Sequence, residues 1–387
     1  MVSNYINFEQ VYQKLKRKLN INIISNYFHT KFDKNALLIY ITAPFYSKKI
    51  SESHQNQWQA VQIAILLKKY KYNVDVIEYT DSKVRLKKTY DMVIGLIPRD
   101  IDIYTGHLRG DCIKIAYLTS SNLRYTNEQE LSRILDLEKR KGVKLKPRRQ
   151  SGYISKAIES FDAAFFIGNE FGFKSYSEFN MPPVFYIKNT GYNFDFKPDY
   201  NKKNPKAFLF FGSVGQVHKG LDLLLEVFTE SAKDLELYIC GNVVSEEDFC
   251  NLYHKELYET SNIKTVGFVD IRSRVFQNLT DYCAYTILPS CAEGCAGSIL
   301  TVMSVGVIPI VSKMCGFDAD EAILLDDCSK DCISRTIRSY SNKDIEWIKD
   351  KSKYVIEVVK SHHSRKAFIS SFDNALNQTL KLKEKSK

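Results

Sequence analysis

The stretch from residue 288 to residue 312, LPSCAEGCAGSILTVMSVGVIPIVS, constrains the fold more than any other part of this chain. It begins at the end of the apolar run Tyr285–Leu288, which is typical of a buried strand, and continues through a loop of small residues. The pattern then predicts a helix from about Gly297 and a second buried strand over Ile308–Val311. A strand, a loop, a helix and a strand within about 30 residues form a βαβ unit, so the sequence predicts a parallel α/β sheet.

The loop of this unit has the chemistry of an anion site. It opens at the carboxyl end of a strand, where open α/β sheets bind their ligands. The only carboxylate in the loop is Glu293, which would lie beside a bound anion and is placed for hydroxyl groups. Unpaired backbone amides at the start of the helix would favour phosphate, and small residues let a ligand approach them closely. The residues concerned are Gly294, Cys295, Ala296, Gly297 and Ser298. A phosphate site next to a hydroxyl-binding acid predicts a nucleotide sugar as the ligand.

The length of 387 residues predicts two domains, because it exceeds what one ordinary core holds. In both halves short apolar runs alternate with helical patterns, which favours two Rossmann-like, doubly wound parallel sheets. Residues 193–205, NFDFKPDYNKKNP, contain two prolines and a run of lysine and asparagine between apolar strands. We expect a linker there, a first domain over 1–192, a second over 206–362 and a final segment over 363–387.

Composition and charge narrow the class of protein. Nine cysteines, an odd number, suit reduced thiols better than a disulfide framework. The start of the chain lacks the apolar core of a signal peptide, and no apolar run is long enough to span a bilayer. We therefore expect a cytoplasmic protein. The net charge of +10 includes basic clusters at Lys14–Lys18, Lys139–Arg149 and Lys381–Lys387. The charge pattern predicts either that these clusters are solvated helix faces or that they attract anionic lipids at the inner face of the membrane. We do not expect a nucleic-acid partner.

Three motifs, in this order, carry a resemblance to a known family: FFGSVGQVHKGLDLLLEVF at 210–228, GFV at 267–269 and PSCAEGCAGSILTVMSVGVIPIVS at 289–312. Together they resemble the donor domain of glycosyltransferases with the two-Rossmann GT-B fold. The most similar family is the large retaining family 4, or "glycosyl transferases group 1", type. Its signature is two glutamates eight positions apart; Glu293 matches the first, and Thr301 replaces the second. The resemblance implies two domains facing across a cleft, with the final helix crossing back to the first domain.

The resemblance also implies roles for individual residues. Lys219 would neutralise the donor's phosphates, Glu293 would contact the transferred sugar, and Thr301 would take the place of a ribose-binding carboxylate. The arginine usual in the family is Ser213 here. Either Ser213 and the Gly215 backbone suffice, or a basic residue of the first domain substitutes for the missing charge. The remaining expected donor contacts are Gly212 at the end of a strand, His218 beside Lys219, and Phe268 and Val269 near the base.

The first domain is expected to contribute a histidine. His54 starts a helix just after the loop of the first strand and would face the cleft, with Asn56 and Gln57 on the acceptor side. We place His54 with Lys219 and Glu293 as the catalytic group. No acidic metal clamp stands out near the site, so we predict a reaction without a metal and without a prosthetic group.

The sequence thus predicts a glycosyltransferase that moves a sugar from a nucleotide-sugar donor, UDP- or GDP-linked, to a glycan, lipid-linked or protein acceptor, with retention. Two alternatives stay open. The first is a non-catalytic GT-B-like subunit that binds glycans or supports a transferase, and the second is a nucleotide-sugar epimerase. The sequence does not favour a dinucleotide dehydrogenase, because no Gly-x-Gly-x-x-Gly follows either first strand.

Overall fold

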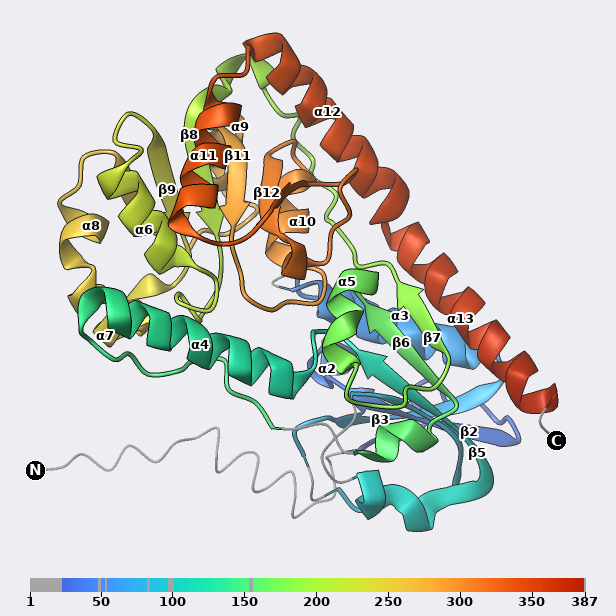
Figure 1. The fold of residues 1–387 in the computed structure, drawn as a ribbon. Coiled ribbons are helices and arrows are strands. Elements are labelled where there is room, and N and C mark those ends of the chain that lie inside the picture. Colours follow the sequence, from blue (N-terminus) through green and yellow to red (C-terminus); the bar gives the residue numbers. More distant parts are fainter. Residues whose placement is uncertain are drawn as a thin grey trace, which may run out of the picture.

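The structure is a computed structural model that describes residues 23–47, 50–52, 54–81, 84–96, 101–152 and 156–385, and only the backbone of 101–103. The basic cluster at Lys14–Lys18 and the last two residues lie outside the described residues. The described chain folds into two α/β halves, each built on one sheet (Figure 1). This confirms the predicted architecture of two Rossmann-like domains.

The first half contains a seven-stranded sheet in the order β1-β3-β2-β4-β5-β6-β7, in which only the pairing of β1 with β3 is antiparallel. Its strands are β1 (Ile23–Ile24), β2 (Lys34–Tyr40), β3 (Tyr72–Glu78), β4 (Tyr90–Gly95), β5 (Leu108–Leu118), β6 (Ala163–Ile167) and β7 (Val184–Ile187). Its helices are α2 (Ala43–Tyr46), α3 (Gln55–Lys69), α4 (Leu123–Lys141) and α5 (Glu170–Phe173).

The central part of β2 is a continuous apolar run because both faces of the sheet are covered there. Successive residues of β2 belong to different hydrophobic clusters: Leu38 packs in one, and Leu37 and Ile39 pack in the other. All three side chains are at most 2% exposed. A continuous apolar run is therefore what a central parallel strand requires.

The second half contains a six-stranded, fully parallel sheet in the order β10-β9-β8-β11-β12-β13. Its strands are β8 (Asn204–Phe211), β9 (Glu236–Cys240), β10 (Ile263–Gly267), β11 (Cys283–Leu288), β12 (Ile308–Ser312) and β13 (Ile323–Leu325). Its helices are α6 (Leu221–Glu230), α7 (Glu247–Leu252), α8 (His254–Tyr258), α9 (Arg274–Tyr282), α10 (Gly297–Met303), α11 (Lys330–Ser341) and α12 (Ile345–His362). The predicted unit at 285–311 is present as β11, α10 and β12.

The final helix, α13 (Arg365–Lys385), crosses back and packs on β6, β7 and α3 of the first half (Figure 1). Phe368 and Phe372 anchor it there and are fully buried. The ring of Phe368 lies 5.7 Å from Trp58, and the ring of Phe372 lies 5.2 Å from Phe165. Aromatic pairs at such distances add to the stability from burial, so α13 ties the two halves together.

Helix α4 is a second connection between the halves. It begins in the first half and reaches the helices of the second (Figure 1), where Arg140 pairs with buried Asp222 and Glu226. The helical pattern alone places Leu131 and Leu135 inward, and this is wrong, because they are 44% and 49% exposed. The buried face carries polar Asn127 and Glu130 as well as Ile134 and Leu137.

Candidate functional site

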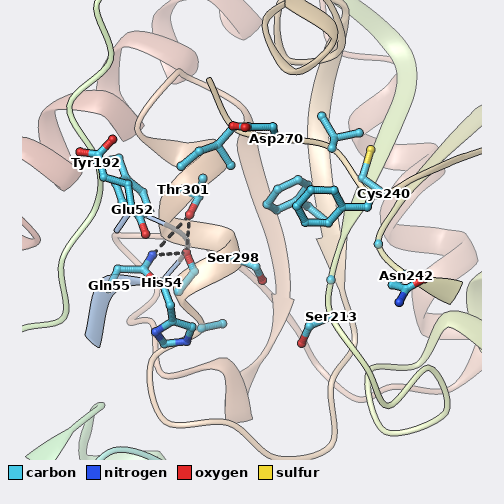
Figure 2. Close-up of a pocket in the computed structure, with 18 of the residues that line it drawn as sticks. Glu52, His54, Gln55, Tyr192, Ser213, Cys240, Asn242, Asp270, Ser298 and Thr301 are labelled. Carbon is cyan, nitrogen blue, oxygen red and sulfur yellow. Dashed lines mark hydrogen bonds between the residues drawn. The ribbon is translucent and has the colours of Figure 1, made fainter. Parts of the chain in front are cut away.

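A pocket of about 700 Å³ lies between the two halves (Figure 2). The second half lines it with the ends of β8, β9, β10 and β11, at residues 211–214, 240–242, 268–272 and within 293–301. The first half closes the other side with residues 50–52, 54, 55, 149 and 192. Pockets of this volume are typical of small-molecule sites.

The topology of the second sheet explains why the pocket forms here. Strands β8 and β11 are neighbours, but β8 leads towards β9 on one side and β11 leads towards β12 on the other. The loops that leave β8 and β11 therefore diverge and open a crevice at the carboxyl ends of the strands. Lys219 comes from the first of these loops and Glu293 from the second.

Lys219 and Glu293 form an ion pair on the wall of the pocket. The distance from Lys219 Nζ to Glu293 Oε1 is 2.7 Å, and the two side chains are 6% and 14% exposed. Ser290 Oγ also donates to Glu293 Oε1, at 3.0 Å. Burial raises the pKa of Glu293, but the charges of Lys219 and Arg149 outweigh it and lower this pKa to about 2. Glu293 is thus ionised at neutral pH, and among the described residues no hydrogen bond reaches its Oε2.

The first half of the molecule holds the Glu293 loop in place. Both the backbone amide and the hydroxyl of Ser121 donate to the Glu293 carbonyl, at 3.0 and 2.5 Å. Gly294 permits this close approach, because a Cβ atom there would lie 2.6 Å from the carbonyl oxygen of Thr119 and 2.8 Å from that of Ile167. Gly294 is therefore a packing residue between the halves, and it does not line the pocket.

Fewer backbone amides at the start of α10 can bind an anion in the pocket than the sequence indicates. Cys295 is buried and outside the pocket, and the amide of Ala296 donates to the Cys315 carbonyl at 3.0 Å. Ala296, Gly297 and Ser298 line the pocket, but α10 has only seven residues. A helix of this length adds little directed charge, so side-chain cations must supply most of the attraction for an anion.

Thr301 lines the pocket, but neighbours already use its hydroxyl. Thr301 Oγ1 donates to the Gly297 carbonyl at 2.8 Å and accepts from Gln55 Nε2 at 3.3 Å (Figure 2). Gln55 Nε2 also donates to the Gly297 carbonyl at 2.8 Å. Gln55, from the first turn of α3, thus fixes the start of α10 across the gap between the halves.

The helix start at His54 is confirmed, but the neighbouring residues point differently from the prediction. His54 caps α3 by accepting from the Asn56 amide at 3.2 Å, and it lines the pocket. Desolvation, with a contribution from the charge of Arg149, lowers the pKa of His54. Asn56 and Gln57 do not line the pocket, whereas Gln55 does. The helix turns about 100° per residue, so Gln55 faces the cleft while the next two residues point away from it.

Two further expected donor contacts lie behind the pocket wall. His218 is fully buried, its Nε2 lies 2.7 Å from the Ala292 carbonyl, and its carbonyl accepts from the Cys291 amide. Desolvation lowers its pKa to about 4, so it is neutral and braces the loop before Glu293. Gly215 does not line the pocket either, because its amide is bonded to buried Glu246.

The other predicted donor contacts all line the pocket, namely Gly212, Ser213, Phe268 and Val269. Phe268 is 81% exposed, whereas Val269 is 7% exposed. A large aromatic ring in water at the edge of a pocket offers a flat surface to a ligand ring.

The lining residues that escaped the sequence analysis include three charged side chains, those of Glu52, Arg149 and Arg272. Glu52 and Arg272 form an ion pair of 2.5 Å across the gap between the halves. Arg149, in a segment that reads as an exposed loop, lines the pocket beside them. The sequence analysis allows for a basic residue of the first domain near the phosphates but does not say which one it is.

The described residues bring together no group of three or more metal-binding side chains. Reaction without a metal nevertheless stays a prediction. Within the same residues no helix combines the length and the apolar character needed to cross a bilayer.

Comparison with known proteins assigns the second half to a family. Residues 205–342 match the family model described as "Glycosyl transferases group 1". The second domain is a group 1 glycosyltransferase domain. The resemblance deduced from the three motifs is thereby confirmed, and the two-sheet arrangement is the GT-B fold. Comparison with curated protein sequences gives no match.

Solved structures share the fold of this chain at low identity. Sucrose-phosphate synthase from Thermosynechococcus elongatus matches with a TM-score of 0.59 and 13% identity, over 89% of this chain and 98% of that one. HepE from Anabaena matches with a TM-score of 0.53 and 11% identity, over 89% and 99%. TarM matches with a TM-score of 0.52 and 11% identity over 74% of this chain. This chain spans about half of the length of TarM, 54%.

Proposed function

We propose that this protein transfers a sugar from a nucleoside-diphosphate sugar to a glycan, lipid-linked or protein acceptor, with retention and without a metal. The observation that carries the proposal is the pair of Lys219 and Glu293 in the interdomain pocket. It presents a cation for a diphosphate next to an ionised carboxylate for sugar hydroxyls. The family of the second domain, and the crystals of HepE with UDP-glucose, support this choice of donor.

Both members of the pair keep capacity for a ligand. An ammonium has three N–H donors, and Glu293 uses one of those of Lys219. A carboxylate has two oxygens, and Lys219 and Ser290 both donate to Oε1 of Glu293. Oε2 is thus left to accept from sugar hydroxyls. The ammonium then stabilises the negative charge that collects on the departing diphosphate, which is an electrostatic contribution to catalysis.

The bond changes balance without a protein nucleophile. The bond between the anomeric carbon and the diphosphate oxygen breaks, and its electron pair stays on the diphosphate. A bond forms between the anomeric carbon and the acceptor oxygen on the same face of the sugar. The acceptor proton passes to the leaving diphosphate, so His54 is required only to position hydroxyl groups. Closure between the two domains excludes water that would otherwise hydrolyse the donor.

A thermal-shift screen of UDP-, GDP-, ADP- and CMP-sugars tests donor binding. A ligand at 100 times its dissociation constant adds about 2.7 kcal/mol to the stability of the folded state. We expect a shift with a UDP- or GDP-sugar and none with the double variant Lys219→Ala/Glu293→Gln, which removes both charges together. The matched control is Lys233→Ala, an exposed lysine of the same domain that does not line the pocket.

Turnover assays separate the transferase from its alternatives. A transferase releases nucleoside diphosphate and needs an acceptor for full activity. An epimerase would convert the donor without an acceptor. Absence of both turnover and donor binding would reject the proposal in favour of an accessory subunit.

A further inference from the structure

The cations on the pocket wall differ in whether they are already paired. Among the described lining residues the lysines and arginines are Arg149, Lys219 and Arg272. Lys219 pairs with Glu293, and Arg272 pairs with Glu52. No carboxylate of the described residues pairs with the guanidinium of Arg149. An anionic ligand in this pocket would therefore find its strongest uncompensated positive charge at Arg149.

The backbone around Arg149 is held rigidly by one buried carboxylate. Glu130, on the inner face of α4, is 1% exposed. It accepts from the Arg148 amide at 2.9 Å, from the Arg149 amide at 2.8 Å and from Gln150 Nε2 at 2.8 Å. Burying a carboxylate costs free energy unless hydrogen bonds satisfy it, so this arrangement fixes the segment in one conformation.

The same segment is attached to the second domain. The Lys146 amide donates to Asp248 Oδ2 at 3.2 Å, and Arg148 forms an ion pair with Asp248. The first domain thus extends a strap, residues 145–151, which is attached to α7 of the second domain. Arg149 belongs to the first domain by sequence but lies at the pocket of the second.

The stem of Arg149 lies directly on the loop that follows β8. A Cβ atom at Gly215 would lie 2.7 Å from Arg149 Cγ and 3.0 Å from its Cδ. Only glycine leaves this space, and its φ of +96° also favours glycine. The charge of Arg149 reaches into the site, because it helps to lower the pKa of Glu293 and of His54.

We propose that Arg149 is the second cation for the diphosphate of the donor, supplied by the first domain to the pocket of the second. The inference rests on the proposed function. A guanidinium presents paired N–H groups that match two phosphate oxygens, whereas a lysine acts as a point charge. Lys219, whose charge Glu293 already offsets in part, would contact the diphosphate from one side and Arg149 from the other. Donor affinity then depends on both domains.

Titration calorimetry with UDP and with uridine tests this inference, with GDP and guanosine as the second pair. Arg149→Ala should weaken UDP binding roughly 10- to 100-fold, the contribution of a charge-assisted hydrogen bond. It should leave uridine binding unchanged, because uridine has no diphosphate. Arg149→Lys should lose part of the affinity for UDP. Lysine keeps the positive charge but lacks the paired N–H groups of the guanidinium. Lys144→Ala is the matched control, an exposed cation just before the strap that does not line the pocket.

The outcomes separate the inference from the function on which it rests. UDP binding that needs Lys219 but not Arg149 would overturn the inference and leave the proposed function standing. An equal loss for UDP and uridine would also overturn it, because the effect would not act through the diphosphate. If the unmodified protein binds neither UDP nor GDP, the proposed function falls as well.

Discussion

The ion pair of Lys219 and Glu293 should stabilise the second domain, so removing either charge should lower the free energy of unfolding. Removing one member of a buried pair typically costs 3–5 kcal/mol, because the other charge stays buried. Here the side chains are 6% and 14% exposed, and Glu293 keeps its bond from Ser290. We therefore expect Lys219→Ala to lower the free energy of unfolding by about 2–3 kcal/mol, less than a sealed pair. Glu293→Gln alone should cost about 1–2 kcal/mol, because water in the open pocket can solvate the ammonium.

The double variant tests whether these losses share one cause. Once both charges are removed, Lys219→Ala/Glu293→Gln should be less destabilised than the sum of the single variants, by about 2 kcal/mol. Urea unfolding followed by far-ultraviolet circular dichroism at pH 7 gives the four free energies. The exposed pair of Lys139 and Asp136, 77% and 51% exposed, is the control and should show a coupling below about 0.5 kcal/mol. Additive losses at 219 and 293, within about 0.5 kcal/mol, would refute a paired role.

Three other predictions concern Gly294, Glu321 and Glu130. Gly294→Ala should destabilise the protein by about 1–3 kcal/mol, because its Cβ would collide with first-domain backbone; urea unfolding that matches the unmodified protein would contradict this. Burial raises the pKa of Glu321, but hydrogen bonds from His363 and His362 lower it to about 2. The stability from this ionised carboxylate, about 3 kcal/mol, is present above pH 4.5 and is lost as the pH falls towards 2, so Glu321→Gln should flatten that part of the stability profile. Glu130→Gln should weaken UDP binding without touching the ligand, and the affinity measured by calorimetry should fall less than in Arg149→Ala.

The sequence predicts the sheets well because their signal is local. A strand buried on both faces must be apolar throughout, and FLFF at 208–211 and LLIYIT at 37–42 satisfy this within a few residues. The return of the final helix to the first domain follows from the family resemblance, and Phe368 and Phe372 are buried there against Trp58 and Phe165. Local reasoning fails for α4, where Leu131 and Leu135 are exposed because Glu130 and its neighbours on the inner face hold the strap.

The candidate site was only partly predictable, because half of it is made by contacts between distant segments. The motif around Glu293 predicts one wall of the pocket, since its residues lie close together in the chain. Gln55 and Arg149 carry no such pattern. They are polar residues in a helix start and in a loop, and each lies more than 60 residues along the chain from the second-domain residue that it contacts. Periodicity and local motifs cannot show which loops meet, so these residues emerge only from the fold.

The contacts that shape the pocket also connect its parts. Ser121 of the first domain holds the backbone of Glu293, Gln55 fixes the start of α10, and the strap carries Arg149 over Gly215. Each of these contacts is lost if the two domains separate, whereas the Lys219–Glu293 pair lies within the second domain and persists. An opened molecule would therefore keep one cation and one carboxylate but lose the second cation and the ordered loop. Because a donor bound to both cations favours the closed arrangement by its differential affinity, donor binding and domain closure are expected to reinforce each other.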